Sequence, residues 1–290
     1  MEVGQGLSWA SMSVAASKPH RSEEDSSVVL VGLAGKPVRA RVSTQGEGSP
    51  VVFLHGLVGL NDHWEDVVRG IRHKARCCLL ELPLLSLSGD DCSIDGATEL
   101  TVRFLEQHHR EASNGDTRRP VLVGNSFGGH VALRIAVERP DLVRGLVLAG
   151  SSGLIEKSMV SDIQIRPSRE WLTRKIGELF FDQSKMNSAD VDRAHQELSN
   201  RSGARAMVKL SRSARRNHLG NKIGQISAPT LLIWGRQDIV TPPEAAHGFQ
   251  SQIRGSRLVW FDRCGHAPMI EAPERFAEAM VEFLEELDRK

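Results

Sequence analysis

The stretch PVLVGNSFGGHVALRIA, Pro120 to Ala136, joins a short β-type run to a glycine-bracketed serine and then to an apolar helix. Residues 120–123 predict a buried strand, and the five residues from Gly124 to Gly128 match the G-x-S-x-G pattern of a nucleophile elbow. Glycine at both ends of this pattern leaves room where the strand and helix backbones approach each other. Ser126 is therefore expected at the N-terminus of the helix, where free N–H groups and the helix dipole favour negative charge.

The overall composition is that of an ordinary globular chain. Its 290 residues are 40% hydrophobic and 25% charged, with a formal net charge of +1. The small net charge disfavours a nucleic-acid binder, and the absence of an apolar run of about 18 residues predicts no membrane span. The first residues lack the basic start of a secretory signal, so we expect a cytoplasmic protein with a flexible N-terminal tail over residues 1–26.

Four cysteines, Cys77, Cys78, Cys92 and Cys264, show no C-x-x-C spacing. This spacing predicts buried thiols in a reducing compartment and not a disulfide framework. The adjacent Cys77 and Cys78 fall in an apolar run that predicts a strand, so their side chains are expected on opposite faces of a sheet.

Strand-like and helix-like segments alternate along residues 27–153 and resume over residues 223–290. This alternation predicts an α/β core with a mostly parallel sheet of eight strands and helices on both faces. The expected strands are 27–33, 38–43, 51–54, 77–82, 120–123, 143–148, 229–234 and 257–261, and the clearest helices are 62–72, 97–111 and 273–287.

Residues 154–222 interrupt the alternation and predict an inserted helical cap. The segment contains 14 Lys plus Arg and 8 Asp plus Glu, a local net charge of +6. Four basic residues lie on one expected helical stripe opposite an apolar one. This stripe predicts either a solvated helix face or a landing surface for an acidic substrate or protein carrier. The basic residues are Arg205, Lys209, Arg212 and Arg216.

Two further polar residues follow predicted strands in the way that Ser126 does. Asp238 comes after the strand at 229–234, and His266 comes after the strand at 257–261. The carboxyl ends of parallel strands share one edge of the sheet, where ligand sites assemble. A serine hydroxyl needs a base to remove its proton and a third group to orient that base, so the three residues predict nucleophilic catalysis.

Four motifs occur in order along the chain: FLHGLVG at 53–59, VGNSFGGHVAL at 123–133, WGRQDIVTPP at 234–243 and CGHAPMIEAPERF at 264–276. With these motifs the chain resembles the α/β-hydrolase superfamily over residues 27–290, outside the variable cap, and most closely its capped, carboxylesterase-like serine hydrolases. The resemblance implies Ser126 as nucleophile, His266 as general base and later acid, and Asp238 as the residue that stabilises the imidazolium. Asp262 and Glu156 are alternative positions for the acid.

The resemblance also implies an oxyanion hole formed by the backbone N–H groups of Leu57 and Phe127. Gly56 shapes this loop, and His55 is expected to hold the loop and not to take part in chemistry. No metal and no organic cofactor is implied.

Two departures from the superfamily's common patterns narrow the chemistry. Serine in place of aspartate at position 126 argues against reactions that pass through an aspartyl ester, as in haloalkane dehalogenases and epoxide hydrolases. Residues 81–88, ELPLLSLS, replace a loop that usually carries two glycines, so this backbone must use ordinary dihedral angles, with leucines that line the site or pack beneath it.

The sequence therefore predicts hydrolysis of a carboxylic ester or related acyl bond in a small molecule, through an acyl-enzyme on Ser126. A carbon-carbon bond hydrolase acting on a ring-cleavage product is an alternative, because such enzymes share the Gly-Asn-Ser-x-Gly-Gly pattern. They usually have tryptophan after the catalytic histidine, whereas this chain has Ala267. A ligand-binding protein with an idle triad is a further alternative.

Overall fold

The computed structural model describes residues 24–111, 118–156 and 167–289. Within them, eight strands form one sheet in the order β1-β2-β4-β3-β5-β6-β7-β8. Strand β2 is antiparallel to β1 and β4, and the remaining pairs are parallel. The predicted mostly parallel, eight-stranded sheet is confirmed. The strands are β1 (Glu24–Val31), β2 (Pro37–Gln45), β3 (Ser49–Leu54), β4 (Ala75–Glu81), β5 (Val121–Asn125), β6 (Gly145–Ala149), β7 (Thr230–Gly235) and β8 (Arg257–Phe261).

The first hairpin differs from its expected bounds. Strand β1 begins at Glu24 and ends at Val31, so the expected end at Leu33 was wrong. Leu33 lies in the turn, because the Gly32 N–H donates to the Lys36 carbonyl oxygen (3.2 Å) and Gly35 has a φ of 68°. Of the expected tail, residues 1–23 lie outside the described residues and residues 24–26 belong to β1.

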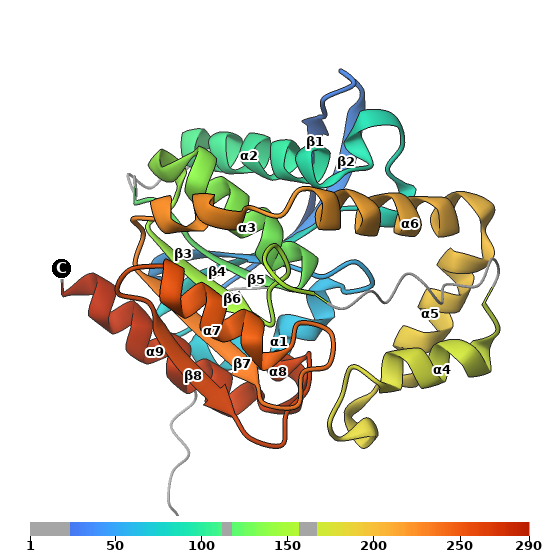
Figure 1. Ribbon diagram of the computed structural model, residues 1–290. Helices are drawn as coiled ribbons and strands as arrows, with labels where there is room; N and C mark the ends of the chain where they lie inside the picture. Colours follow the sequence, from blue (N-terminus) through green and yellow to red (C-terminus); the bar gives the residue numbers. More distant parts are fainter. Residues whose placement is uncertain (1–23, 112–117, 157–166, 290) are drawn as a thin grey trace, which may run out of the picture.

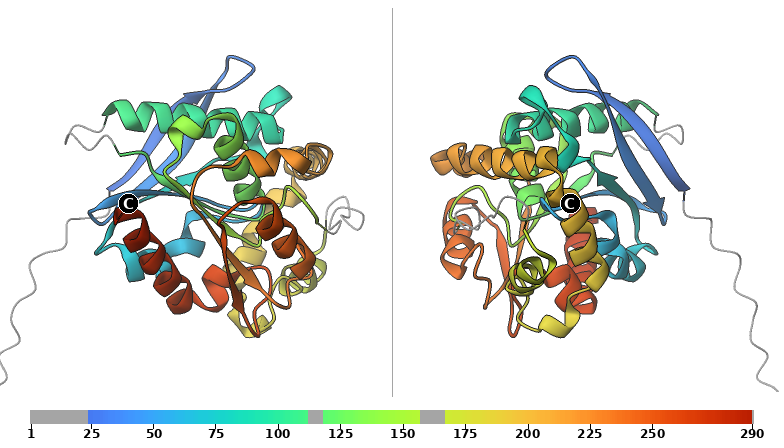
Figure 2. Two further views of the ribbon diagram at one scale, coloured as in Figure 1. Left: turned by 60° about the vertical axis from the view of Figure 1, so that its left-hand side comes forward. Right: turned by 90° about the vertical axis from the view of Figure 1, so that its right-hand side faces the viewer.

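Helices cover both faces of the sheet (Figure 1; Figure 2). On one face, α1 and α9 pack against strand residues such as Cys77, and on the other, α2, α3 and α7 pack against residues such as Cys78. The opposite orientation of the two cysteines is confirmed, and all four cysteines are free and buried. No helix in the described part of the chain is long and apolar enough to cross a membrane. These helices are α1 (Glu65–Ile71), α2 (Ile94–Glu111), α3 (Phe127–Glu138), α7 (Pro243–Gln252) and α9 (Pro273–Asp288).

Three α-helices among the described residues lie between β6 and β7 in the chain and extend beyond the sheet (Figure 1). They are α4 (Arg169–Gly177), α5 (Ser188–Ser199) and α6 (Arg201–Arg216). The Ser168 and Asn187 side chains cap the N-termini of α4 and α5 by accepting backbone N–H bonds. Residues 157–166 of the expected cap lie outside the described residues, and residues 167–222 are called the helical insertion below.

The leucines of residues 81–88 pack beneath the insertion. Leu82, Leu84, Leu85 and Leu87 are buried in the apolar core that also contains Leu210 of α6. No residue of this segment has a positive φ, as expected for a loop without glycine. These leucines therefore support the insertion and are absent from the described lining of the cavity beside Ser126.

Candidate active site

Ser126 lies at the sharp turn between β5 and α3. Its φ of 53° and ψ of −117° fall in a region that residues with a side chain rarely adopt. A Cβ atom at Gly124 would lie 2.4 Å from the Gly128 carbonyl oxygen, and one at Gly128 would lie 2.3 Å from the Leu54 carbonyl oxygen. Only glycine fits at either position, and the turn presents the serine at the N-terminus of α3.

His266 and Asp238 meet at the carboxyl ends of β8 and β7. The His266 Nδ1 atom lies 2.9 Å from Asp238 Oδ2, and both residues are buried. The other carboxylate oxygen, Oδ1, accepts the backbone N–H groups of Val240 (2.8 Å) and Thr241 (2.9 Å). The Thr241 hydroxyl donates to Oδ2 at 2.8 Å. Asp238 is therefore held as an acceptor, and it leaves Nε2 as the ring nitrogen of His266 that is available to Ser126.

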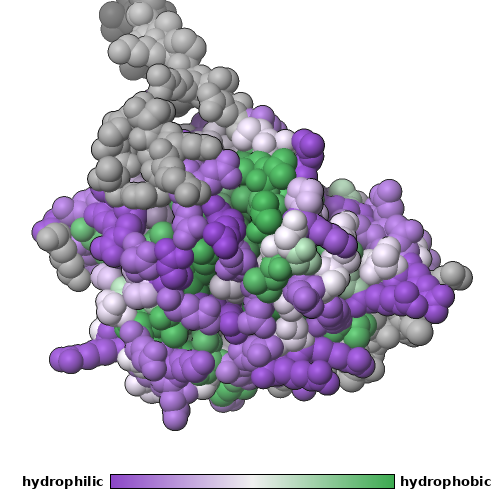
Figure 3. Space-filling model, turned by 90° about the horizontal axis from the view of Figure 1, so that it is seen from above, coloured by the Kyte–Doolittle hydropathy of each residue, from purple (hydrophilic) through white to green (hydrophobic). Residues whose placement is uncertain are grey.

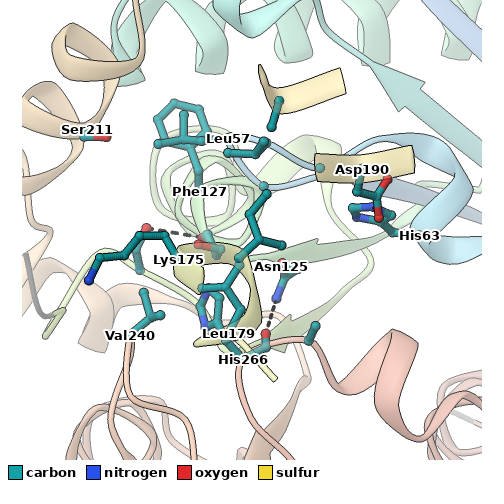
Figure 4. A pocket seen from close by; sticks show the side chains of 18 of the residues that line it. Leu57, His63, Asn125, Phe127, Lys175, Leu179, Asp190, Ser211, Val240 and His266 are labelled. Carbon is teal, nitrogen blue, oxygen red and sulfur yellow. Dashed lines mark hydrogen bonds and ion pairs between the residues drawn. The ribbon is translucent and has the colours of Figure 1, made fainter. Parts of the chain in front are cut away.

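The main chain of His266 is also fixed. Its carbonyl oxygen accepts the Asn125 side-chain amide at 3.0 Å (Figure 4), and the same amide group donates to the Ala149 carbonyl oxygen at 2.9 Å. The His266 N–H donates to the Leu179 carbonyl oxygen, in the helical insertion, at 2.7 Å. The nucleophile elbow, the loop that carries His266 and the helical insertion thus meet at His266.

The two alternative carboxylates have other partners. Asp262 forms an ion pair with Arg236 at 2.6 Å, and Glu156 lies 3.1 Å from Nε2 of His218. Within the part of the chain that the structure describes, Asp238 is the carboxylate that contacts His266. The geometry therefore favours Asp238 over Asp262 and Glu156 as the acid.

The loop after β3 forms the other side of the site. Leu57 and Phe127 both line the cavity next to Ser126. The His55 side chain donates from Nδ1 to the Gly56 carbonyl oxygen (2.7 Å), and burial lowers the pKa of His55, so the neutral ring braces the loop. A Cβ atom at Gly56 would lie 3.5 Å from the Ser126 Cβ, in van der Waals contact, so Gly56 lies directly beside the nucleophile.

A cavity of about 230 Å³ lies between Ser126, His266 and the helical insertion (Figure 4). Its lining is mostly apolar and includes Trp171, Ile176 and Leu179 from the insertion. The polar lining residues include the charged Glu156, Lys175 and Arg215. They also include the pair formed by His63 Nε2 and Asp190 Oδ2 at 3.0 Å, which joins the core to α5. In residues 24–111, 118–156 and 167–289, no group of three or more His, Cys, Asp or Glu side chains is placed to hold a metal.

Two supporting residues of the site are not among those predicted from the sequence. Thr241 reaches Asp238 through both its hydroxyl and its N–H, and Asn125 fixes the carbonyl of His266. Both stand inside motifs that were recognised, three residues after Asp238 and one before Ser126. The short spacing of Thr241 is typical of a side chain that bonds back to a nearby carboxylate, and it could have identified this residue.

A mostly parallel sheet with a serine at a strand-to-helix elbow and a His–Asp pair on neighbouring strand ends defines an α/β serine hydrolase. The chain belongs to the Alpha/beta hydrolase family, whose model matches residues 51–279. The expected superfamily is confirmed.

Known relatives divide between two chemistries. The chain is 28% identical over 253 residues to the pimeloyl-[acyl-carrier protein] methyl ester esterase of Nitrosomonas europaea, covering 81% of this chain and 95% of that protein. It is 28% identical over 257 residues to the 2-hydroxy-6-oxo-6-(2'-aminophenyl)hexa-2,4-dienoic acid hydrolase of Metapseudomonas resinovorans, covering 85% and 88%. The crystal structure of a serine hydrolase involved in carbazole degradation superposes with a TM-score of 0.73 at 27% identity, covering 90% of this chain and 99% of that one.

Proposed function

We propose that this protein hydrolyses a carboxylic ester or related acyl bond through an acyl-enzyme on Ser126. The observation that carries the proposal is the strained Ser126 at the start of α3, beside a histidine whose Nδ1 is held by Asp238. The cavity next to these residues is mostly apolar and, at about 230 Å³, small, which favours short ester groups.

In acylation, the Ser126 Oγ attacks the substrate carbonyl carbon while His266 Nε2 takes the hydroxyl proton. Asp238 stabilises the imidazolium that forms. Leu57 and Phe127 line the cavity, and their backbone N–H groups are assigned to donate to the carbonyl oxygen as it becomes an oxyanion. His266 then gives its proton to the leaving alkoxide, and the carbon-oxygen bond of the ester breaks.

In deacylation, water enters where the alcohol has left. His266 takes a proton from this water as its oxygen attacks the acyl carbon, and the same two N–H groups stabilise the second oxyanion. The proton returns to the Ser126 oxygen, and the carboxylic acid leaves. Each role is filled by a side chain or N–H of this chain, with no further reactant than water.

The proposal predicts turnover of a short-chain p-nitrophenyl ester and covalent labelling of Ser126 by a serine-directed phosphonate. Because p-nitrophenolate leaves without protonation, whereas carbon-carbon cleavage must expel a carbanion that needs a proton, kcat/KM for this ester should exceed that for a vinylogous diketone ring-cleavage product. Hydrolysis rates measure the turnover of the two substrates, and mass spectrometry of the labelled peptide identifies the residue that the phosphonate modifies. Tight binding of an ester without turnover or labelling would instead indicate a binding protein with an idle triad.

Carbon-carbon bond hydrolysis is the second candidate. The M. resinovorans relative and others act, by name, on hydroxy-oxo acids. The cavity lining includes Arg215 and also Lys175, which pairs with Glu178 at 3.0 Å, and cationic groups suit a carboxylate. Faster turnover of the ring-cleavage product than of every ester tested would favour this candidate.

The exposed face of α6 suggests an acidic partner for the same reaction. Arg205, Lys209, Arg212 and Arg216 are all exposed along one side, while Leu210 and Ala214 are buried on the other. Hydrophilic side chains cover most of the molecule's face on the side of α2 and α6 (Figure 3). Lys209 donates to the Gly89 carbonyl oxygen, and none of the four basic residues has a carboxylate partner among the described residues. No described carboxylate therefore neutralises the stripe, which suits an acidic acyl carrier.

Reversal of charge at these four positions, each to Glu, is expected to lower kcat/KM for a carrier-bound ester by about tenfold or more, because steering and docking lose their attraction. The free methyl ester of the same acid should be hydrolysed at the wild-type rate, since α6 presents these side chains away from its buried face. Rates for both substrates, each measured at two salt concentrations, separate the loss of electrostatic attraction to the carrier from a change in catalysis itself. Equal rates on both substrates would leave the stripe as solvated surface.

A further inference from the structure

Two segments that are far apart in the sequence meet beside His266. Residues 179–182 follow α4 in the helical insertion, and residues 264–271 carry His266 and α8 (Pro268–Glu271). We call their contact the insertion junction. A Cβ atom at Gly265 would lie 2.4 Å from the Leu179 carbonyl oxygen and 3.0 Å from the Phe181 nitrogen. The two backbones therefore touch directly.

One carboxylate binds both sides of the insertion junction. Glu271 Oε1 accepts the Gly265 N–H at 2.7 Å, from the residue that precedes the histidine. Glu271 Oε2 accepts the N–H groups of Phe181 (2.8 Å) and Asp182 (3.2 Å), both in the insertion. Each oxygen thus serves one segment. The three N–H donors are main-chain groups whose proton positions are fixed, and the Cys264 thiol also donates to Oε1 at 3.7 Å.

These bonds close a ring of contacts around the histidine. Glu271 holds Gly265 and Phe181, and the insertion in turn accepts the His266 N–H through the Leu179 carbonyl oxygen. The insertion also lines the cavity with Leu179 and Phe180, so the same segment covers the substrate site and anchors the histidine backbone. A shift of residues 179–182 would move the imidazole relative to Ser126.

We propose that Glu271 is a positioning residue, which aligns His266 for proton transfer by fixing its loop to the helical insertion. The proposal rests on the acyl-transfer function given above and adds that the insertion sets the acid–base geometry as well as the shape of the cavity. In this role Glu271 contacts neither the substrate nor Ser126. Its effect on the rate is exerted through the orientation of His266.

The variant Glu271→Gln tests this role with little change in shape. An amide has one oxygen and one NH₂ group, so whichever way it turns, its NH₂ faces an N–H donor on one side of the insertion junction. Glu285→Gln is the matched control, because Glu285 lies in the adjacent helix α9 and pairs at the surface with Lys74. Kinetics are measured per active site, with the active fraction titrated by a fluorophosphonate.

Two esters of one short acid, a methyl ester and a p-nitrophenyl ester, report on the histidine. Methoxide must receive a proton from His266 to leave, whereas p-nitrophenolate leaves unprotonated. A misaligned histidine should therefore lower kcat/KM for the methyl ester by about 10- to 100-fold in Glu271→Gln. The fold-loss for the aryl ester should be smaller than this by a factor of about five or more. Glu285→Gln should match the wild type on both.

Other outcomes overturn the proposal. A loss shared equally by both esters, a rise confined to KM, or a lower active fraction with unchanged rates per site would assign Glu271 to folding or substrate binding alone. If Glu271→Gln does not fold, Glu271→Asp, which keeps the charge but spans only one side, carries the same test.

The test also separates this proposal from the proposed function. If the wild type hydrolyses neither ester, ester hydrolysis is wrong, and the rate of Ser126 labelling by the fluorophosphonate still reports on His266 as a base. Labelling about tenfold slower in Glu271→Gln than in Glu285→Gln supports the positioning role. Equal labelling rates overturn it.

Discussion

Replacement of Ser126 by alanine is expected to lower kcat by about 10⁴- to 10⁶-fold, because the covalent route is lost and only binding and oxyanion stabilisation remain. The geometry supports so large an effect, because Ser126 alone among the described serines lining the cavity stands at the elbow: Ser152 donates its hydroxyl to the Ser126 carbonyl oxygen, and Ser211 belongs to α6. Steady-state ester hydrolysis and phosphonate labelling, with extensively purified protein, measure the loss. Residual turnover within about tenfold of the wild type would place the nucleophile elsewhere.

The variant Ser126→Gly separates catalysis from folding. At a φ of 53° and a ψ of −117° a serine is strained, whereas glycine adopts this region readily. Ser126→Gly should therefore abolish activity like Ser126→Ala but raise the free energy of unfolding by about 1–2 kcal/mol relative to it. Denaturant unfolding measures this difference. If the two variants are equally stable, the elbow stores no strain at this position.

The elbow and the sheet could be predicted because their signals are local. Alternating side chains along β3, β4 and β5 place successive residues in opposite halves of the core, and Cys77 and Cys78 show the same alternation. The G-x-S-x-G pattern likewise reflects contacts within a few residues, such as that between Gly124 and Gly128. Such features can be predicted from a sequence because the contacts that require each residue type are made by residues close to it in the chain.

The contacts of Glu271 could not be predicted, because its partners Phe181 and Asp182 are about 90 residues away and offer only backbone N–H groups. A main-chain donor has no signature in the sequence. The same reason hid the bond from His266 to Leu179. Strand β1 also begins before its expected start at residue 27, because Glu24, Asp25 and Ser26 pair with β2 through backbone groups despite their polar side chains.

Which of Asp238, Asp262 and Glu156 is the catalytic acid could be predicted only in part. All three follow or adjoin predicted strand ends, so the sequence could place them near the site and could not pair them. Pairing was decided by the loop after β7, where two N–H groups and a hydroxyl converge on Asp238. This convergence also allows a sharp prediction for an isosteric change.

Replacement of Asp238 by asparagine is expected to lower kcat by about 10⁴-fold with the fold retained. The N–H groups of Val240 and Thr241 point at Oδ1, so the amide must place its oxygen there and its NH₂ toward His266. His266 Nδ1 must then accept a hydrogen bond, and its proton moves to Nε2, on the side of Ser126. A protonated Nε2 cannot take the serine proton.

Asp262→Asn is the matched control, because Asp262 follows the next strand, β8, and its ion pair among the described residues is with Arg236 at an exposed site. Exposed ion pairs contribute at most about 1 kcal/mol, so this variant should keep wild-type kinetics and stability. Circular dichroism and thermal melting check that Asp238→Asn is folded before its rates are compared. Full activity in Asp238→Asn together with a large loss in Glu156→Gln would instead assign the acid to the carboxylate after β6. The bond between Asp238 and His266 would then be structural, and His266 would need a different partner during catalysis.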